Sequence, residues 1–194
     1  EVPRSQIRLV DPTELDQQLS EMADDSKSRQ KTANLKSLGN LKQLVIANSS
    51  HFENIEQLRA QLPQHRQFLK KLSNRIKIQA AQDLPLHLGQ ILLSGPAGNG
   101  KSWLCEQIAN ALNLPMLSLQ LAGSSDIMTL RGSERQWSNS DAGRPVRFMA
   151  ECSVANPIIM LDEVDKMGAG NNGNPADTLL MLLEPENARR FMDN

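Results

Sequence analysis

Apolar residues are sparse in the first fifty positions, and several of them are spaced as on a helix. Leu15, Leu19 and Met22 recur at intervals of four and three residues, which places their side chains on one helix face. Asp11, followed by a proline, provides a helix start before them. The stripe is thin, so we expect this helix to need a partner surface. The alternating run at residues 6–10 predicts an edge strand.

Two further helices are predicted between residues 51 and 90, where the apolar stripe is denser. The first begins near Phe52 and is interrupted at Pro63, because proline breaks helices. The second carries Leu69 and Ile76 on one face. The zone holds six basic and three acidic residues, an excess that a solvated helix face explains more simply than a nucleic-acid site. The basic residues of the second helix include Lys70, Lys71, Arg75 and Lys77.

From residue 91 onward, short apolar runs alternate with helical patterns. This alternation is typical of an α/β fold, in which helices cover both faces of a parallel sheet. The predicted strands are Ile91–Leu93, Met116–Leu121 and Pro157–Leu161, and the predicted helices are Lys101–Asn113 and Pro175–Leu183.

Composition excludes several classes of protein. The 21 Lys and Arg residues nearly cancel the 22 Asp and Glu, for a net charge of −1, which argues against a general polyanion binder. Aromatic residues make up 3% and Tyr is absent, so no large stacking surface for single-stranded nucleic acid is expected. No apolar run approaches the roughly 20 residues of a membrane span. Cys105 and Cys152 form no C-x-x-C pair, which favours a cytoplasmic protein with reduced thiols.

The strongest chemical signal is the run GPAGNGKS at Gly95–Ser102. It fits the pattern G-x-x-x-x-G-K-[ST], which average composition would produce in about 1% of chains of this length. A predicted strand precedes it and a predicted helix follows it, as a phosphate-binding loop requires. Glycines free the backbone so that successive N–H groups can surround a phosphate, and the helix dipole points at the same place. The alternative is a glycine-rich turn with an incidental lysine.

In such a loop, Lys101 adds a mobile charge for the β- and γ-phosphates, and the Ser102 hydroxyl ligates Mg²⁺. We therefore predict Lys101 to be catalytic and Ser102 to be a metal ligand. The predicted nucleotide-binding residues of this segment are Gly95, Pro96, Ala97, Gly98, Asn99, Gly100, Lys101, Ser102 and Trp103.

A second motif, PIIMLDEVDK, delivers Asp162 and Glu163 to the C-terminal end of a predicted strand. In a doubly wound sheet that end faces the phosphate site. Asp162 would hold Mg²⁺ through water, and Glu163 would act as the catalytic base on the attacking water. The water-activating acid favours hydrolysis, and the absence of an N-K-x-D guanine reader favours ATP. Alternatively, Glu163 only starts a helix.

Together with LRGSERQWSNSDAGRP and GNPADTLLMLLEPEN, these motifs resemble the ATPase module of Lon-type proteases, within the AAA+ superfamily. The resemblance covers residues 91–187, and ENARRF is similar to an offshoot family of uncharacterised Lon-like AAA ATPases. It implies the P-loop NTPase fold of an AAA+ large subdomain. It also implies a homo-oligomeric ring that hydrolyses ATP to unfold or remodel a protein substrate.

The same resemblance assigns roles to residues outside the two motifs. Trp137 falls in a loop that lines the pore of such a ring and grips unfolded polypeptide. His51 and Phe52 match a His-aromatic pair that lies near the adenine. Residues 168–174 would form a second pore loop. The alternatives are a Trp packed on the domain surface and, for 168–174, a plain connection.

The expected organisation is a polar, partly helical segment at residues 1–50 and an AAA+ ATPase domain at 51–194. That domain would comprise a helical lead-in at 51–90 and the P-loop core at 91–194. Against the family pattern, further strands, a sensor residue, an arginine finger, a helical lid and a Ser-Lys peptidase are missing. Because the opening EVPRSQ also lacks Met, we expect a piece of a longer protein with no protease activity in these residues.

The leading hypothesis is a cytoplasmic, Mg²⁺-dependent ATP hydrolase of Lon-like AAA+ type that acts on a protein substrate. One alternative is a nucleotide-gated scaffold that binds ATP and hardly hydrolyses it. Another is a DNA-associated AAA+ ATPase, for which the basic helix within 51–90 is the support. The three histidines are scattered, so no histidine metal site is expected.

Overall fold

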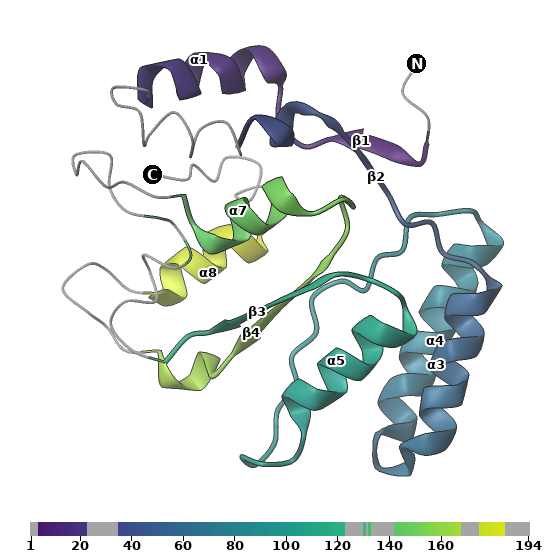
Figure 1. Ribbon diagram of the computed structural model, residues 1–194. Coiled ribbons are helices and arrows are strands. Elements are labelled where there is room, and N and C mark those ends of the chain that lie inside the picture. Colours follow the sequence, from purple (N-terminus) through teal and green to yellow (C-terminus); the bar gives the residue numbers. More distant parts are fainter. Residues whose placement is uncertain are drawn as a thin grey trace. The chain divides into compact units, whose positions relative to one another are not determined.

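The structure, a computed structural model, describes residues 4–22, 35–122, 130, 132, 142–167 and 175–184 (Figure 1). The chain divides into two compact units that interleave along the sequence. The predicted pore residues, Trp137 and 168–174, lie outside the described part. The domain boundary at residue 50 stays a prediction. The first unit comprises Glu1–Ile7, Lys42–Met116 and Ser153–Met160, and the second comprises Arg8–Leu41, Leu117–Cys152 and Leu161–Asn194.

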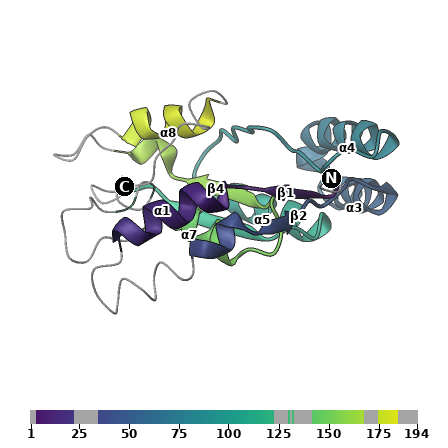
Figure 2. The same cartoon turned by 90° about the horizontal axis from the view of Figure 1, so that it is seen from above.

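Three helices form most of the first unit, and all three confirm predictions. α3 (Ser49–Gln61) and α4 (Arg66–Ala81) are separated by a 3-10 turn, η2 (Pro63–His65), and they lie side by side in both views (Figures 1 and 2). α5 (Lys101–Ala111) follows the phosphate loop. The apolar stripes of the three helices meet in one buried cluster. Its most deeply buried members include Ile55, Leu69, Ile76, Leu104 and Leu112.

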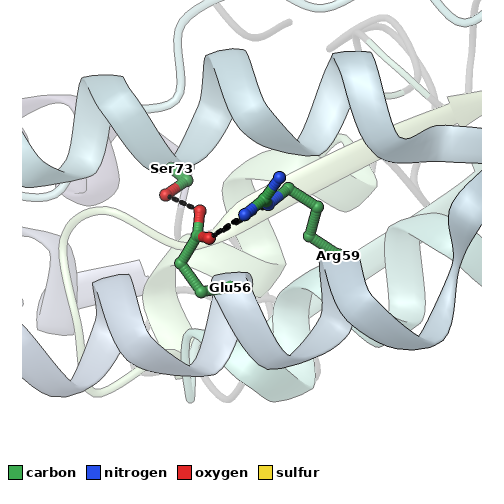
Figure 3. Close-up of polar contacts among 3 residues, drawn as sticks. All are labelled: Glu56, Arg59 and Ser73. Atoms are coloured by element: carbon green, nitrogen blue, oxygen red, sulfur yellow. Dashed lines mark hydrogen bonds and ion pairs between the residues drawn. The ribbon is translucent and has the colours of Figure 1, made fainter.

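A polar contact also joins α3 to α4 (Figure 3). The Ser73 hydroxyl on α4 donates a 2.5 Å hydrogen bond to Glu56 Oε1 on α3, and Ser73 has no exposed surface. The other carboxylate oxygen, Oε2, pairs with Arg59 of the same helix. A buried hydroxyl needs a hydrogen-bond partner, so Glu56 provides the acceptor that lets Ser73 pack inside the helix pair.

One parallel strand pair occurs in the described residues, β3 (Met116–Gln120) and β4 (Ile158–Asp162). Ile158 N–H donates to Pro115 O and Leu121 N–H donates to Asp162 O, each at 2.9 Å, which joins the two ends of β4 to the residues that flank β3. Both strands therefore advance in the same direction. The two strand predictions are confirmed, and the described residues combine mixed helices with a small parallel sheet.

The predicted strand at Ile91–Leu93 is wrong. These residues belong to neither described sheet, and Leu92 is 86% exposed. The chain just before them is held on α4, where the Gln79 side-chain amide donates to His87 O at 2.8 Å and accepts from His87 N–H at 3.3 Å. An apolar run becomes a buried strand only where other strands flank it, and the described parallel sheet offers no such central position.

The second unit confirms the predicted helices at its two ends and adds elements that were not predicted. α1 (Pro12–Met22) and α8 (Pro175–Leu183) agree with the sequence patterns. The 3-10 turn η1 (Lys36–Gly39) and the helix α7 (Arg144–Glu151) were not predicted. Leu179 of α8 and Phe148 of α7 pack in one apolar cluster with the buried leucines of β3, in keeping with the α/β class.

The thin stripe of α1 has the partner surface that it needs. Leu15 and Leu19 are buried together with Leu38 of η1 and Ala150 of α7. This cluster is separate from the one that Leu179 of α8 forms with the buried leucines of β3.

A second strand pair joins β1 (Gln6–Arg8) to β2 (Leu41–Gln43). β1 confirms the predicted edge strand, whereas β2 was not predicted. Among the described helices, each is too short or too polar to cross a membrane.

Candidate functional site

The phosphate loop presents bare backbone at two of its glycines. Gly98 and Gly100 have φ values of 78° and 70°, a left-handed conformation that costs other residues about 1–2 kcal/mol. A Cβ added to either glycine would meet no heavy atom within 4 Å. The space beside each glycine is therefore open, and a ligand can approach the backbone there.

Helix α5 begins directly at this loop. Gly100 is its N-cap residue and supplies no side-chain acceptor, while Leu104 N–H makes the first helical bond to Gly100 O at 2.8 Å. The N–H groups of the first turn carry the positive end of the helix dipole. The start of α5 is thus suited to an anion, as the sequence predicts.

Lys101 reaches back across the loop. Its Nζ donates to Gly95 O at 3.0 Å and to Pro96 O at 2.9 Å, so the structure brings three of the predicted residues together. These two carbonyl oxygens are neutral acceptors, and phosphate oxygens bind an ammonium more strongly because they carry charge. The side chain is therefore placed at the loop with partners that a nucleotide can replace.

The two residues after Lys101 lie on the first turn of α5. Ser102 is half-buried, and Trp103 is 47% exposed. Trp103 is a large apolar side chain beside a polar loop, so it offers a surface that a base or sugar can cover.

His51 has a local structural partner. Its backbone N–H donates to Asn48 Oδ1 at 3.1 Å, and its Nδ1 accepts from Asn48 N–H at 3.3 Å, which is a reciprocal cap of α3. The imidazole is buried, and burial lowers its pKa because the charged form is disfavoured there. The neutral ring with Nδ1 as acceptor is the form that this cap requires.

The start of α3 lies at the far end of α5 from the phosphate loop. Asn54 Nδ2 donates to Ala111 O at 2.9 Å, and Ala111 is the last residue of α5. Phe52 is half-buried, with Lys77 Nζ 5.5 Å from its ring centroid. The structure therefore does not bring His51 and Phe52 to the phosphate loop, and their adenine contact stays a prediction.

Asp162 and Glu163 form a tight turn at the end of β4. Asp162 is the last residue of the strand, and its Oδ1 accepts from Glu163 N–H at 2.9 Å. Glu163 adopts φ 58° and ψ 35°, which is uncommon for a residue with a side chain and is often found where function constrains the backbone. A 3-10 turn, η3 (Val164–Lys166), follows.

Lys166 is a polar neighbour of Glu163 that the sequence analysis did not identify. Its Nζ forms a short ion pair with Glu163 Oε1, and this hydrogen bond, with the nearby carboxylates, raises the pKa of Lys166. The signal was the Glu-x-x-Lys spacing, which brings side chains together once the chain turns as a helix.

The two halves of the candidate site belong to different compact units. The phosphate loop, Gly95–Ser102, lies in the first unit, and the acidic turn, formed by Asp162 and Glu163, lies in the second. Each half suits Mg·ATP chemistry by its own residues: open glycines, a helix start and a lysine for phosphates, and hydroxyl and carboxylate oxygens for a hard cation. Ser102 and Asp162 are the predicted Mg²⁺ ligands, one in each unit. Among the described residues, no three His, Cys, Asp or Glu side chains are grouped as a metal site.

Comparison with known proteins gives one family match. The family model described as "ATPase family associated with various cellular activities (AAA)" matches residues 91–192, a stretch that contains both the phosphate loop and the acidic turn.

Curated relatives of the chain include several Lon proteases. The chain is 32% identical over 166 residues to "Lon protease" of Malacoplasma penetrans, covering 85% of the chain and 19% of that protein. It is 38% identical over 104 residues to "Lon protease homolog 1, mitochondrial" of Arabidopsis thaliana, covering 54% and 11%. It is 41% identical over 104 residues to "Lon protease 4" of Sorangium cellulosum, covering 54% and 13%. The chain thus spans less than a fifth of the length of these relatives.

Proposed function

The chain belongs to the AAA family of ATPases, and from this premise we propose that it binds Mg·ATP on the Gly95–Ser102 loop and hydrolyses it with Glu163 as the base. The observation that carries the proposal is the loop itself. Gly98 and Gly100 leave open space, and the Lys101 ammonium is already held against the loop carbonyls. The order of the two motifs along the chain, with Asp162 and Glu163 at the end of β4, supports the pairing of the loop with these two acids.

In the proposed reaction, Lys101 exchanges the carbonyl oxygens of Gly95 and Pro96 for oxygens of the β- and γ-phosphates. Ser102 and Asp162 would hold Mg²⁺, and the cation would supply charge that offsets that of the phosphates. Glu163 takes a proton from the water that attacks the terminal phosphorus, and the bond to the bridging oxygen of ADP breaks. Inorganic phosphate and ADP leave.

We further propose that this hydrolysis drives work on a protein substrate within a ring of identical subunits. The support is the similarity to proteins named Lon protease over 85% of the chain in one case. Trp137 would lie on the loop that grips the substrate, because a bulky ring can hold any polypeptide without sequence preference.

The test is ATP turnover by the full-length protein and by Glu163→Gln. The variant should bind a fluorescent ATP analogue as tightly as the wild type and should not turn it over, since the amide cannot accept the proton. Glu106→Gln is the matched control, because Glu106 is an exposed residue of α5. Full turnover by Glu163→Gln would exclude Glu163 as the base, and absence of Mg·ATP binding by the wild type would overturn the proposed function.

A second candidate function, association with nucleic acid, is favoured by the composition of α4. The helix carries five basic residues and no acidic one, and all five are exposed. Phosphate contacts by such residues make binding strongly salt-dependent. DNA-stimulated turnover that falls as salt rises would support this function, whereas stimulation by an unfolded protein would support the motor. The five residues are Arg66, Lys70, Lys71, Arg75 and Lys77.

A further inference from the structure

We propose that Lys166 is a positioning residue for Glu163, holding its carboxylate in the orientation that the water-activating step requires. The inference rests on the proposed function of Glu163 and adds a residue to that site. It comes from the geometry of the turn after β4, where Lys166 contacts Glu163 through both its backbone and its side chain.

Three contacts from immediate neighbours fix Glu163. Its N–H donates to Asp162 Oδ1 at 2.9 Å. Its carbonyl oxygen accepts from Lys166 N–H at 2.9 Å. Its Oε1 forms the ion pair with Lys166 Nζ. The backbone contacts set where the side chain starts, and the ion pair sets the direction in which the carboxylate points.

The ion pair gives the two carboxylate oxygens of Glu163 different roles. Oε1 is held by the ammonium of Lys166, so Oε2 is the oxygen left to accept a proton from water. A carboxylate with several rotatable bonds otherwise samples many orientations, and a base must be held near its proton to be effective. Lys166 removes that freedom without itself touching the nucleotide.

Stability does not account for the pair. The Lys166 side chain is 59% exposed and that of Glu163 is 34% exposed, and exposed pairs contribute little to folding. A second pair in the same unit, Lys36 with Asp16, has a similarly exposed lysine at 61%. It joins α1 to η1, away from the acidic turn, and so provides a matched comparison.

The experiment compares ATP turnover by the wild type, Lys166→Met, Lys166→Arg and Lys36→Met in the full-length protein. Methionine keeps the apolar stem and removes the ammonium, and arginine restores a cation. We expect Lys166→Met to lower kcat by roughly tenfold or more, as loss of orientation does, with KM for ATP unchanged. Lys166→Arg should recover much of kcat, and Lys36→Met should resemble the wild type.

Binding of the ATP analogue and the thermal melting temperature are measured on the same samples, so that misfolding is separated from loss of positioning. The inference is overturned if Lys166→Met leaves kcat unchanged or raises it. It is also overturned if the variant changes KM for ATP by the same factor as kcat. If the wild type turns over ATP and Glu163→Gln does not, such a result counts against Lys166 alone. If the wild type lacks turnover, the proposed function of Glu163 fails and the role of Lys166 fails with it.

Discussion

The hydroxyl of Ser73, which has no exposed surface, donates to the carboxylate of Glu56 across the α3–α4 interface. Glu56 is only partly covered, with 29% of its side chain exposed, so water can reach the acceptor but not the donor. The contact therefore matters to the two partners differently. The Ser73 hydroxyl depends on Glu56 for its acceptor, whereas the Glu56 carboxylate would still contact Arg59 and water if Ser73 were replaced.

The first prediction follows from this asymmetry. Ser73→Ala removes the buried donor and leaves an acceptor that water can still reach, so it should cost about 1 kcal/mol of unfolding free energy. Urea unfolding followed by circular dichroism measures the change. Ser20→Ala is the control, because the Ser20 hydroxyl is exposed and bonds within its own helix, to Gln17 O. A loss in Ser20→Ala as large as that in Ser73→Ala would contradict the argument.

The second prediction concerns acid stability. The Ser73 hydrogen bond, followed by the Arg59 contact, lowers the pKa of Glu56 from its ordinary 4.5. A carboxyl whose folded-state pKa lies below its unfolded value stabilises the fold above that unfolded value, and the contribution is lost as pH falls through the folded pKa. Glu56→Gln should therefore lose stability at neutral pH and show a shallower decline than the wild type below pH 4.5. Parallel declines would show that Glu56 does not titrate with unfolding.

The elements that could be predicted are those with a complete pattern of their own. An apolar stripe long enough to define a helix occurs in each of α3, α4, α5 and α8. Pro63 marks the break between α3 and α4. β2, three residues long, offers no alternation to detect, and α7 follows a glycine and begins Arg-Pro, which reads as a turn. Ile91–Leu93 has the apolar composition of a strand, but composition alone does not show whether other strands lie beside it to pair with.

The candidate site divides in the same way. Its residue types and spacing identified the loop and the acidic pair, since glycine, lysine and carboxylates are required by the chemistry. The contacts of Lys101 with Gly95 O and Pro96 O depend on how the loop closes, which no pattern of residues specifies. The Glu-x-x-Lys spacing indicates the contact of Lys166 with Glu163 only where the chain turns as a helix. The family resemblance assigned His51 to the nucleotide site. The structure shows that His51 takes part in the cap of α3, a role that Asn48, three residues earlier, could have indicated.

The third prediction tests that cap. Asn48 Oδ1 accepts from His51 N–H at the start of α3, so Asn48→Ala should cost about 1 kcal/mol of stability, and Asn48→Ser should restore most of it. Because burial lowers the pKa of His51, its contribution is present above the ordinary value of 6.5 and is lost as pH falls through the lower folded value. His51→Ala should remove that part of the pH dependence. Thermal melts from pH 8 to pH 5 on the three variants measure both effects, and equal melting temperatures throughout would refute the cap.

The fourth prediction separates the effect of filling the space beside Gly100 from the effect of straining the backbone there. Gly100 and Gly89 have φ values of 70° and 73°, so alanine at either position carries a similar strain of about 1–2 kcal/mol. A Cβ at Gly89 would lie 2.7 Å from Arg75 Nη1, the end of a flexible side chain that can move aside, whereas one at Gly100 meets no protein atom. Both variants should therefore fold with comparable, modest losses of stability. Gly100→Ala should lose binding of Mg·ATP in calorimetry, because its methyl group occupies the space that we assign to phosphate, and Gly89→Ala should bind normally. Equal affinities in the two variants would mean that the open space at Gly100 is not where the nucleotide lies.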